Sequence, residues 1–321
     1  MRDINITDNE AGQRLDRFLR KLLKETSLTE IYKCIRKGTV KVNNKKAKEN
    51  YMLQIGDVVS LYIEDTNYQK TYNESFEEIK VVYEDDNLII VNKPVGLLSH
   101  PESSKDKDTL VQRVIGHMIK SGKEEFSPTF APALCNRLDR NTSGLIIAAK
   151  NYTTLKNINK MIRERGLIKH YLCVVKGVTR DKGEIKSLIN KDKEKRQAII
   201  DTTETIIGKE ARTAYEKLAD NGDFSLLKVE LITGRFHQIR AHLSSIGYPI
   251  IGDTKYGDKD VNNYFSKKFG LNNQFLVAYS LYFKNPPDSL EYLKEKRLYS
   301  SIPKDFTTII QNLFGHAKIE L

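Results

Sequence analysis

Residues 136–150 read NRLDRNTSGLIIAAK, a polar loop that runs directly into an apolar segment. The apolar part, Leu145–Ala149, has the length and composition of a buried strand. The loop before it holds Asp139 between Arg137 and Arg140, and a neighbouring cation favours the ionised form of a carboxyl group. An ionised carboxylate at the mouth of a sheet can act as a nucleophile or a base. The same residues also fit a loop held together by Asp–Arg pairing, so both interpretations stay open here.

The segments around this stretch show more strand patterns than helix patterns. Strands are expected at residues 81–83, 88–91, 145–149, 169–176, 212–218, 224–232, 275–283 and 290–298. Helices are expected at residues 109–120, 152–164, 236–243 and after Pro303. The charged segment 181–196 shows no clear period. Because several strands are joined by hairpins, we expect an α+β fold with a mostly antiparallel mixed sheet and flanking helices.

A smaller α+β unit is expected at the N-terminus. Apolar residues recur at helical spacing from Leu15, and a second helix begins at Ser27, which forms an S-x-x-E capping box, and ends at Gly38. Short strands follow, and then a polar stretch without any period. These patterns divide the chain into a small domain at residues 1–64, a linker at 65–77 and a large domain at 78–321.

The charge balance points to an anionic partner. The chain has 53 Lys and Arg against 42 Asp and Glu, which gives a net charge of +11. Such a surplus favours nucleic acid first and an anionic membrane second. The two N-terminal helices carry basic faces opposite their apolar stripes, and we expect these to bind RNA phosphates: Arg14, Arg17, Lys33, Arg36 and Lys37.

Several classes of protein are excluded by pattern. No apolar run reaches the about 18 residues of a membrane span, and the first residues lack the apolar core of a secretory signal. Cys34, Cys135 and Cys173 are odd in number and lack metal-site spacing. We therefore expect a cytoplasmic protein without a disulfide framework, a metal or a membrane partner.

Two further polar clusters interrupt apolar patterns. Residues 233–242, TGRFHQIRAH, could form a helix from Phe236 whose start binds phosphate, or a capped surface helix. Residues 163–171, RERGLIKHY, bring a basic stretch into a strand that bears Tyr171. A tyrosine there could stack on an RNA base or fill the core.

Taken together, these segments resemble the RluA-type pseudouridine synthases, in the order that the family has them. Residues 136–150 resemble the signature H-R-L-D-x-x-T-S-G-L-L-L, and residues 168–177, IKHYLCVVKG, resemble the K-x-Y segment that follows it. Residues 233–257 resemble the long C-terminal signature, and residues 12–63 resemble the S4 RNA-binding module. The nearest subgroup is the RluC-like synthases of large-subunit ribosomal RNA. Asn136 and Phe236 depart from the family's usual His and its usual Thr or Ser.

The resemblance implies the pseudouridine synthase fold behind an S4-like domain, and an enzyme that isomerises specific uridines in large-subunit (23S) ribosomal RNA or its assembly precursor. It implies no cofactor, and we expect a monomer. By position, Asp139 matches the catalytic aspartate, Tyr171 the tyrosine that stacks on the target base, and Arg240 the basic residue that pairs with the aspartate. Residues expected to bind the substrate are Arg137, Arg235, His237, Gln238 and Leu281, the last as an apolar wall of the pocket.

Two questions stay open at this point. Asp139 could attack C1′ of the uridine or remove its 2′ proton to give a glycal. The main alternative function is a non-catalytic S4-type RNA-binding or ribosome-associated protein. A glycosidic hydrolase is a third class, but it would need a second carboxylate that pairs with Asp139.

Overall fold

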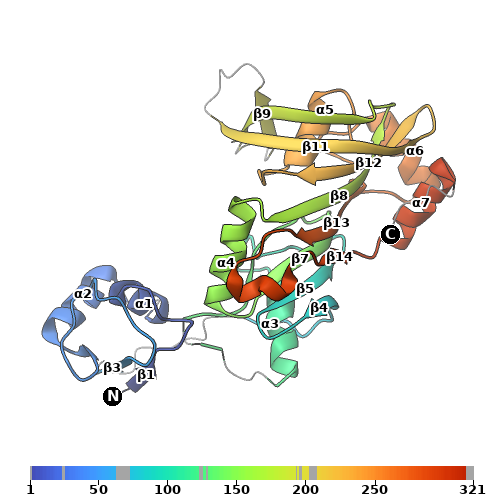
Figure 1. The fold of residues 1–321 in the computed structure, drawn as a ribbon. Helices are drawn as coiled ribbons and strands as arrows, with labels where there is room; N and C mark the ends of the chain where they lie inside the picture. Colours follow the sequence, from blue (N-terminus) through green and yellow to red (C-terminus); the bar gives the residue numbers. More distant parts are fainter. Residues whose placement is uncertain are drawn as a thin grey trace.

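A computed structural model of the chain describes it in segments, namely residues 2–23, 26–62, 73–122, 126–127, 129–192, 194, 197–201 and 208–315. The described residues build two units, which Figure 1 shows: a small N-terminal unit with one buried hydrophobic cluster, and a large unit whose buried side chains form three clusters. The expected linker at 65–77 lies in large part outside the described residues.

The small unit packs two helices against a three-stranded sheet. The strands are β1 (Arg2–Asn5), β2 (Val40–Val42) and β3 (Val58–Leu61), in the order β1-β3-β2, and the helices are α1 (Leu15–Leu22) and α2 (Leu28–Lys37). The capping box is confirmed, because the Ser27 side chain accepts a hydrogen bond from the Glu30 backbone N–H at 3.2 Å. Gly38 ends α2 with a φ of 79°. The strand β1 was not expected from the sequence.

The large unit is organised around one mixed sheet. Its strands are β4 (Lys80–Glu84), β5 (Leu88–Lys93), β6 (Ala133–Leu134), β7 (Ser143–Ala149), β8 (Leu167–Lys176), β9 (Lys182–Asp192), β10 (Gln197–Asp201), β11 (Lys209–Asp220), β12 (Phe224–Leu231), β13 (Leu276–Phe283) and β14 (Arg297–Tyr299). The order is β10-β9-β11-β12-β8-β13-β7-β5-β4, with β6 on β7 and β14 on β13. Only the β13–β7 pair among these described strands is parallel, so the expected mostly antiparallel mixed sheet is confirmed.

Helices cover both faces of this sheet. They are α3 (Leu110–Lys120), α4 (Tyr152–Arg163), α5 (Gln238–Ser245), α6 (Lys259–Phe269), the 3₁₀ helix η1 (Asp288–Leu293) and α7 (Lys304–Phe314). Because side chains alternate along a strand, Ile89 and Val91 of β5 face the core with α3, α5, α6 and α7, whereas Leu88 and Ile90 face α4 and η1. Within the described residues, no helix is long and apolar enough to cross a membrane.

Several elements differ from the sequence-based expectation. The weakly patterned segment 181–196 contains the long strand β9, which is half-exposed and is held by pairing with β10 and β11. The strand expected at 290–298 is wrong: η1 follows Pro287, buries Leu290 and Leu293, and leaves only the short strand β14. The helix α6 was not foreseen, and α5 begins at Gln238 rather than Phe236.

The two units touch near the N-terminal end of α4. Glu10 of the small unit is fully buried, and its carboxylate accepts hydrogen bonds from the Ser127 and Thr129 hydroxyls of the large unit. The Asn9 side chain accepts a hydrogen bond from the Tyr152 backbone N–H at 2.9 Å. These contacts place the small unit beside the first turn of α4, as Figure 1 shows.

The parallel pair β7–β13 requires a glycine. Gly144 has a φ of 114°, and a Cβ there would lie 2.2 Å from the Ala278 carbonyl oxygen. We expect Gly144→Ala to lower the free energy of unfolding by about 2–4 kcal/mol, because it combines backbone strain with a clash against backbone. Urea unfolding measures this difference. Gly234→Ala is the control, because its Cβ would meet nothing within 4 Å. Equal losses in the two variants would contradict the close approach.

Candidate active site

Asp139 lies in the loop before β7, at the boundary between two large pockets. One pocket has a volume of about 630 Å³ and the other about 780 Å³, and both are lined by Asp139, Arg137, Phe236 and His237. Volumes of this size are usual for pockets that enclose a small ligand. The Asp139 side chain is 24% exposed, so a molecule that enters either pocket can reach its carboxylate.

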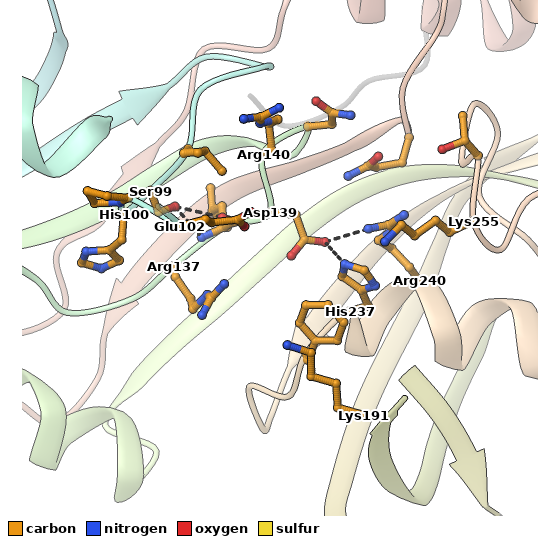
Figure 2. Close-up of a pocket in the computed structure, with 17 residues that line it drawn as sticks. Ser99, His100, Glu102, Arg137, Asp139, Arg140, Lys191, His237, Arg240 and Lys255 are labelled. Carbon is orange, nitrogen blue, oxygen red and sulfur yellow. Dashed lines mark hydrogen bonds and ion pairs between the residues drawn. The ribbon is translucent and has the colours of Figure 1, made fainter. Parts of the chain in front are cut away.

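Two charged side chains in series, Arg240 and Asp253, hold the Asp139 carboxylate in place. The Arg240 guanidinium donates from Nη1 to Asp139 Oδ2 at 2.9 Å, and from Nε and Nη2 to the Asp253 carboxylate at 2.7 and 2.8 Å. Asp253 is buried and its Oδ1 also accepts hydrogen bonds from the backbone N–H groups of Lys255 and Tyr256. Figure 2 shows the pairing of Arg240 with Asp139. The two-point contact with Asp253 fixes the guanidinium plane and therefore its direction toward Asp139.

Burial and neighbouring charges have opposite effects on the pKa values of Arg240 and Asp253. Burial by itself would lower the pKa of Arg240, but the carboxylates of Asp253 and Asp139 outweigh it and hold that pKa above its ordinary value. Burial would raise the pKa of Asp253, but Arg240 and the backbone N–H donors hold it below its ordinary value. Both groups of this buried pair are therefore charged at neutral pH. The sequence neighbours Arg137 and Arg140 form no ion pair with Asp139 in the described structure. The cation that pairs with Asp139 is instead Arg240, which is distant in the sequence.

His237 stands beside Asp139 as a neutral group. Its Nε2 lies 3.6 Å from Asp139 Oδ2, and its Nδ1 lies 3.0 Å from the Tyr256 hydroxyl (Figure 2 shows the first contact). Burial lowers the pKa of His237 to about 4. The residue has a φ of 51° and precedes the first turn of α5, so His237 is not part of the helix that was expected from Phe236.

Tyr171 approaches Asp139 from β8. It is 5% exposed and lines the larger pocket together with Asp139. Burial, and then the nearby Asp139 carboxylate, raise the pKa of Tyr171 well above its ordinary value, so its hydroxyl stays protonated at neutral pH. The structure thus brings together Asp139, Tyr171 and Arg240, which are separated by tens of residues in the chain.

The remaining predicted substrate residues lie in different positions. Arg137 and Arg235 are exposed and line the larger pocket. Gln238 is buried, and its amide already binds Thr233, Arg235, Arg212 and Thr213. Leu281 is 2% exposed and does not line these pockets; it packs in a buried cluster that borders Cys135 and Ile162, which do. Gln238 therefore shapes the turn at 233–235, and Leu281 supports the pocket wall from behind.

Two buried lysines near the site were missed from the sequence. Lys93 is fully buried, and its Nζ donates to the carbonyl oxygens of Pro94, Leu97 and Arg140, which ties the 94–97 turn to the loop that carries Asp139. Burial lowers the pKa of Lys93 to about 7. Lys169 lies two residues before Tyr171 on β8, is 9% exposed and lines the larger pocket. The spacing of two on a strand is the signal that could have placed Lys169 beside Tyr171.

The basic residues predicted on the small unit are accessible. Arg17, Lys33, Arg36 and Lys37 are exposed. Arg14 instead forms a two-point ion pair with Asp16, at 2.8 and 3.1 Å, which also stabilises the start of α1. Within the described part of the chain, no three His, Cys, Asp or Glu side chains cluster as a metal site needs.

Both units are similar to known proteins. Residues 87–245 match the family model described as RNA pseudouridylate synthase, and residues 13–59 match that of the S4 domain. An uncharacterized RNA pseudouridine synthase of Bacillus subtilis is 32% identical over 313 residues, covering 97% of both chains. Ribosomal large subunit pseudouridine synthase C of Buchnera aphidicola is 33% identical over 326 residues, covering 97% of this chain and 96% of its own.

A solved structure shows the same fold. Human RNA pseudouridylate synthase domain containing 4 superposes with a TM-score of 0.58 at 23% identity, over 73% of this chain and 92% of that chain. The large unit therefore has the pseudouridine synthase fold expected from the sequence.

A histidine behind the site makes stability depend on pH. His242 of α5 is fully buried between the hydroxyls of Ser187 and Thr213, each at 2.9 Å, and burial lowers its pKa from 6.5 to about 4. The unfolded chain therefore binds the proton first as the pH falls. The stability contributed by this group is present above pH 6.5 and is lost as the pH falls toward 4.

We expect His242→Gln, which keeps an amide between the same two hydroxyls, to flatten this pH dependence. Urea unfolding at pH 7.5 and pH 5 measures this dependence. Between these two pH values, the free energy of unfolding of the variant should fall less than that of the wild type. The slope of this free energy against pH should differ between the two proteins by up to about one bound proton. Identical slopes for both proteins would contradict the low pKa of His242.

Proposed function

The chain belongs to the RNA pseudouridylate synthase family and is therefore a pseudouridine synthase, and from this premise we propose that it isomerises specific uridines of large-subunit (23S) ribosomal RNA with Asp139 as the catalytic carboxylate. The name of the Buchnera aphidicola relative supports the substrate class. The observation that carries the residue assignment is the position of Asp139, which is bound to Arg240 where two pockets meet.

The reaction needs a carboxylate at the ribose. Pseudouridine forms when the N1–C1′ bond of uridine breaks, the uracil turns, and C5 bonds to C1′, with the proton of C5 lost and a proton gained at N1. Asp139 would either attack C1′ or remove the 2′ proton to give a glycal, and both routes begin at the same carboxylate. Since nothing is oxidised and no atom is lost from the nucleotide, the proposal involves no cofactor.

Arg240 is proposed to orient this carboxylate. It binds Asp139 through Oδ2, while Oδ1 has no hydrogen-bond partner among the described residues and is left for the substrate. Because Asp253 fixes the guanidinium on its other side, the carboxylate is held in place before RNA arrives.

Tyr171 is proposed to receive the uracil ring. A uridine inside an RNA helix has to leave its stack before it reaches Asp139, and an aromatic side chain offers a surface for the extruded base. Tyr171 lines the pocket as a neutral phenol, which suits stacking on an uncharged base. Arg137 and Arg235 at the same pocket are proposed to bind the RNA backbone.

The S4 domain is proposed to bind the same RNA. Its exposed cations, Arg17, Lys33, Arg36 and Lys37, can pair with phosphates on either side of the modified uridine. Asp139 at the pockets and the match to an enzyme family favour this function over a non-catalytic RNA-binding protein.

Asp139→Asn tests the catalytic assignment. We expect pseudouridine formation in an unmodified 23S ribosomal RNA transcript to fall at least about a thousandfold, because the amide is isosteric but cannot act as nucleophile or base. Affinity for the transcript should stay close to that of the wild type. Mass spectrometry of digested RNA detects pseudouridine and distinguishes it from free uracil, the product of a hydrolase.

Asp181→Asn is the matched control for this experiment. Asp181 is 90% exposed and pairs only at the surface with Lys217, so the same chemical change there should leave turnover unaltered. Turnover of Asp139→Asn within tenfold of the wild type would overturn the assignment. A wild-type protein that binds the transcript and forms no pseudouridine would favour another RNA substrate.

A series at Tyr171 tests the stacking role. Tyr171→Phe keeps the ring, so RNA affinity should change little, whereas Tyr171→Ala should weaken binding by about 1–3 kcal/mol. Fluorescence anisotropy with the same transcript measures both, with circular dichroism as the check that Tyr171→Ala is folded. Equal affinities for the three proteins would count against stacking.

A further inference from the structure

The helix α4 connects the small unit to the active-site pocket. Its first residue, Tyr152, donates its backbone N–H to Asn9 of the small unit, and Lys21 of that unit places its Nζ 5.2 Å from the centre of the Tyr152 ring. At the other end, Ile162 and Arg163 line the larger pocket beside Asp139. In Figure 1, α4 lies along the side of the large unit that faces the small one.

The exposed face of α4 is basic from Lys156 to its C-terminal end. Lys156, Lys160 and Arg163 follow one another at i, i+4 and i+7 and are all exposed. The helix sequence, YTTLKNINKMIR, contains no acidic residue. Glu164, at its C-terminal end, reaches Lys160 only at 4.0 Å, with both side chains more than half exposed. Lys156 and Lys160 repel each other at a spacing of four, whereas Lys160 and Arg163 lie in the last turn, where a cation interacts favourably with the helix dipole.

The basic face continues into the pocket. Arg165 lines the pocket and has a φ of 59°, a left-handed conformation in which glycine is the preferred residue after a helix. Beyond it, Lys169 is 9% exposed in the pocket wall, and its Nζ has no hydrogen bond or ion pair within the described residues. Burial lowers the pKa of Lys169, and an anionic group that entered the pocket would compensate the buried charge.

We propose that α4 is a phosphate track that carries the RNA backbone from the S4 domain to the catalytic pocket, with Lys156, Lys160, Arg163 and Arg165 as its cations and Lys169 at its inner end. The inference rests on the proposed function and names the path that the RNA takes. A helix of 12 residues is about 18 Å long, which matches about five nucleotides at 3.4 Å per step. The track therefore runs from the contact with the small unit to the pocket along a short stretch of one strand.

The test removes the first two charges of the track, counted from the end near the small unit. We compare the full-length wild type with K156Q/K160Q, with the charge-conserving K156R/K160R, and with the control K267Q/K304Q. The control lysines are exposed on α6 and α7, at the edge of the large unit away from α4 in Figure 1, and their change alters the net charge equally. Affinity for the unmodified 23S transcript is measured by anisotropy across a salt series, and pseudouridine formation is measured at saturating RNA.

We expect K156Q/K160Q to bind about tenfold more weakly or worse near 100 mM salt, with a salt slope smaller by about two, because each lost phosphate contact removes about one released counterion. Its rate at saturating RNA should stay near that of the wild type, since neither residue reaches Asp139. K156R/K160R should keep the wild-type affinity and slope, and so should K267Q/K304Q.

Two results would overturn the track. One is an unchanged affinity and slope for K156Q/K160Q, and the other is an equal loss in K267Q/K304Q, which would reflect net charge alone. Both comparisons are binding measurements and do not need turnover. A wild type that forms no pseudouridine in the transcript would instead count against the proposed function, so the two failures can be told apart.

Discussion

The buried pairing of Arg240 with Asp253 is the contact on which the site depends. It joins α5 to the loop that follows it, and it aims the guanidinium at Asp139, which lies about a hundred residues earlier in the chain. Removing one partner of such a pair leaves an uncompensated buried charge and typically costs about 3–5 kcal/mol. The arrangement is therefore costly to break and rigid while intact, and a carboxylate that has to meet a ribose carbon benefits from that rigidity.

The central strands decide where this pair meets the substrate pockets. The close approach of β13 to Gly144 sets the start of β7, and the Asp139 loop directly precedes it. Lys93, the last residue of β5, binds the Arg140 carbonyl of that loop and the Pro94 and Leu97 carbonyls of the next turn, while Tyr171 enters from β8 on the other side. The neutral His237 and Tyr171 surround the Asp139–Arg240 pair, so the charge in the centre of the site is concentrated on the groups proposed for chemistry and orientation.

Electrostatics link the site to the rest of the molecule. The small unit docks at one end of α4, and the larger pocket opens at the other end. The exposed cations of α4 therefore lie between the contact with the small unit and the larger pocket. A long polyanion could then be held at several points while one nucleotide is presented to Asp139, which separates affinity from chemistry.

Local patterns in the sequence were enough for the elements that depend on nearby residues. The cap at Ser27, the stop at Gly38 and the apolar strand at 145–149 follow from short-range periodicity and capping, and the match to a family brought Asp139, Tyr171 and Arg240 forward as candidates. Other features depended on contacts between distant segments. The strand β9 is held by its neighbours although it lacks a period of its own, and Asp253 becomes the partner of Arg240 only when the loop after α5 folds back. Likewise, Arg137 and Arg140 flank Asp139 in sequence, yet it pairs with Arg240, because proximity in a folded chain is set by packing and not by spacing along it.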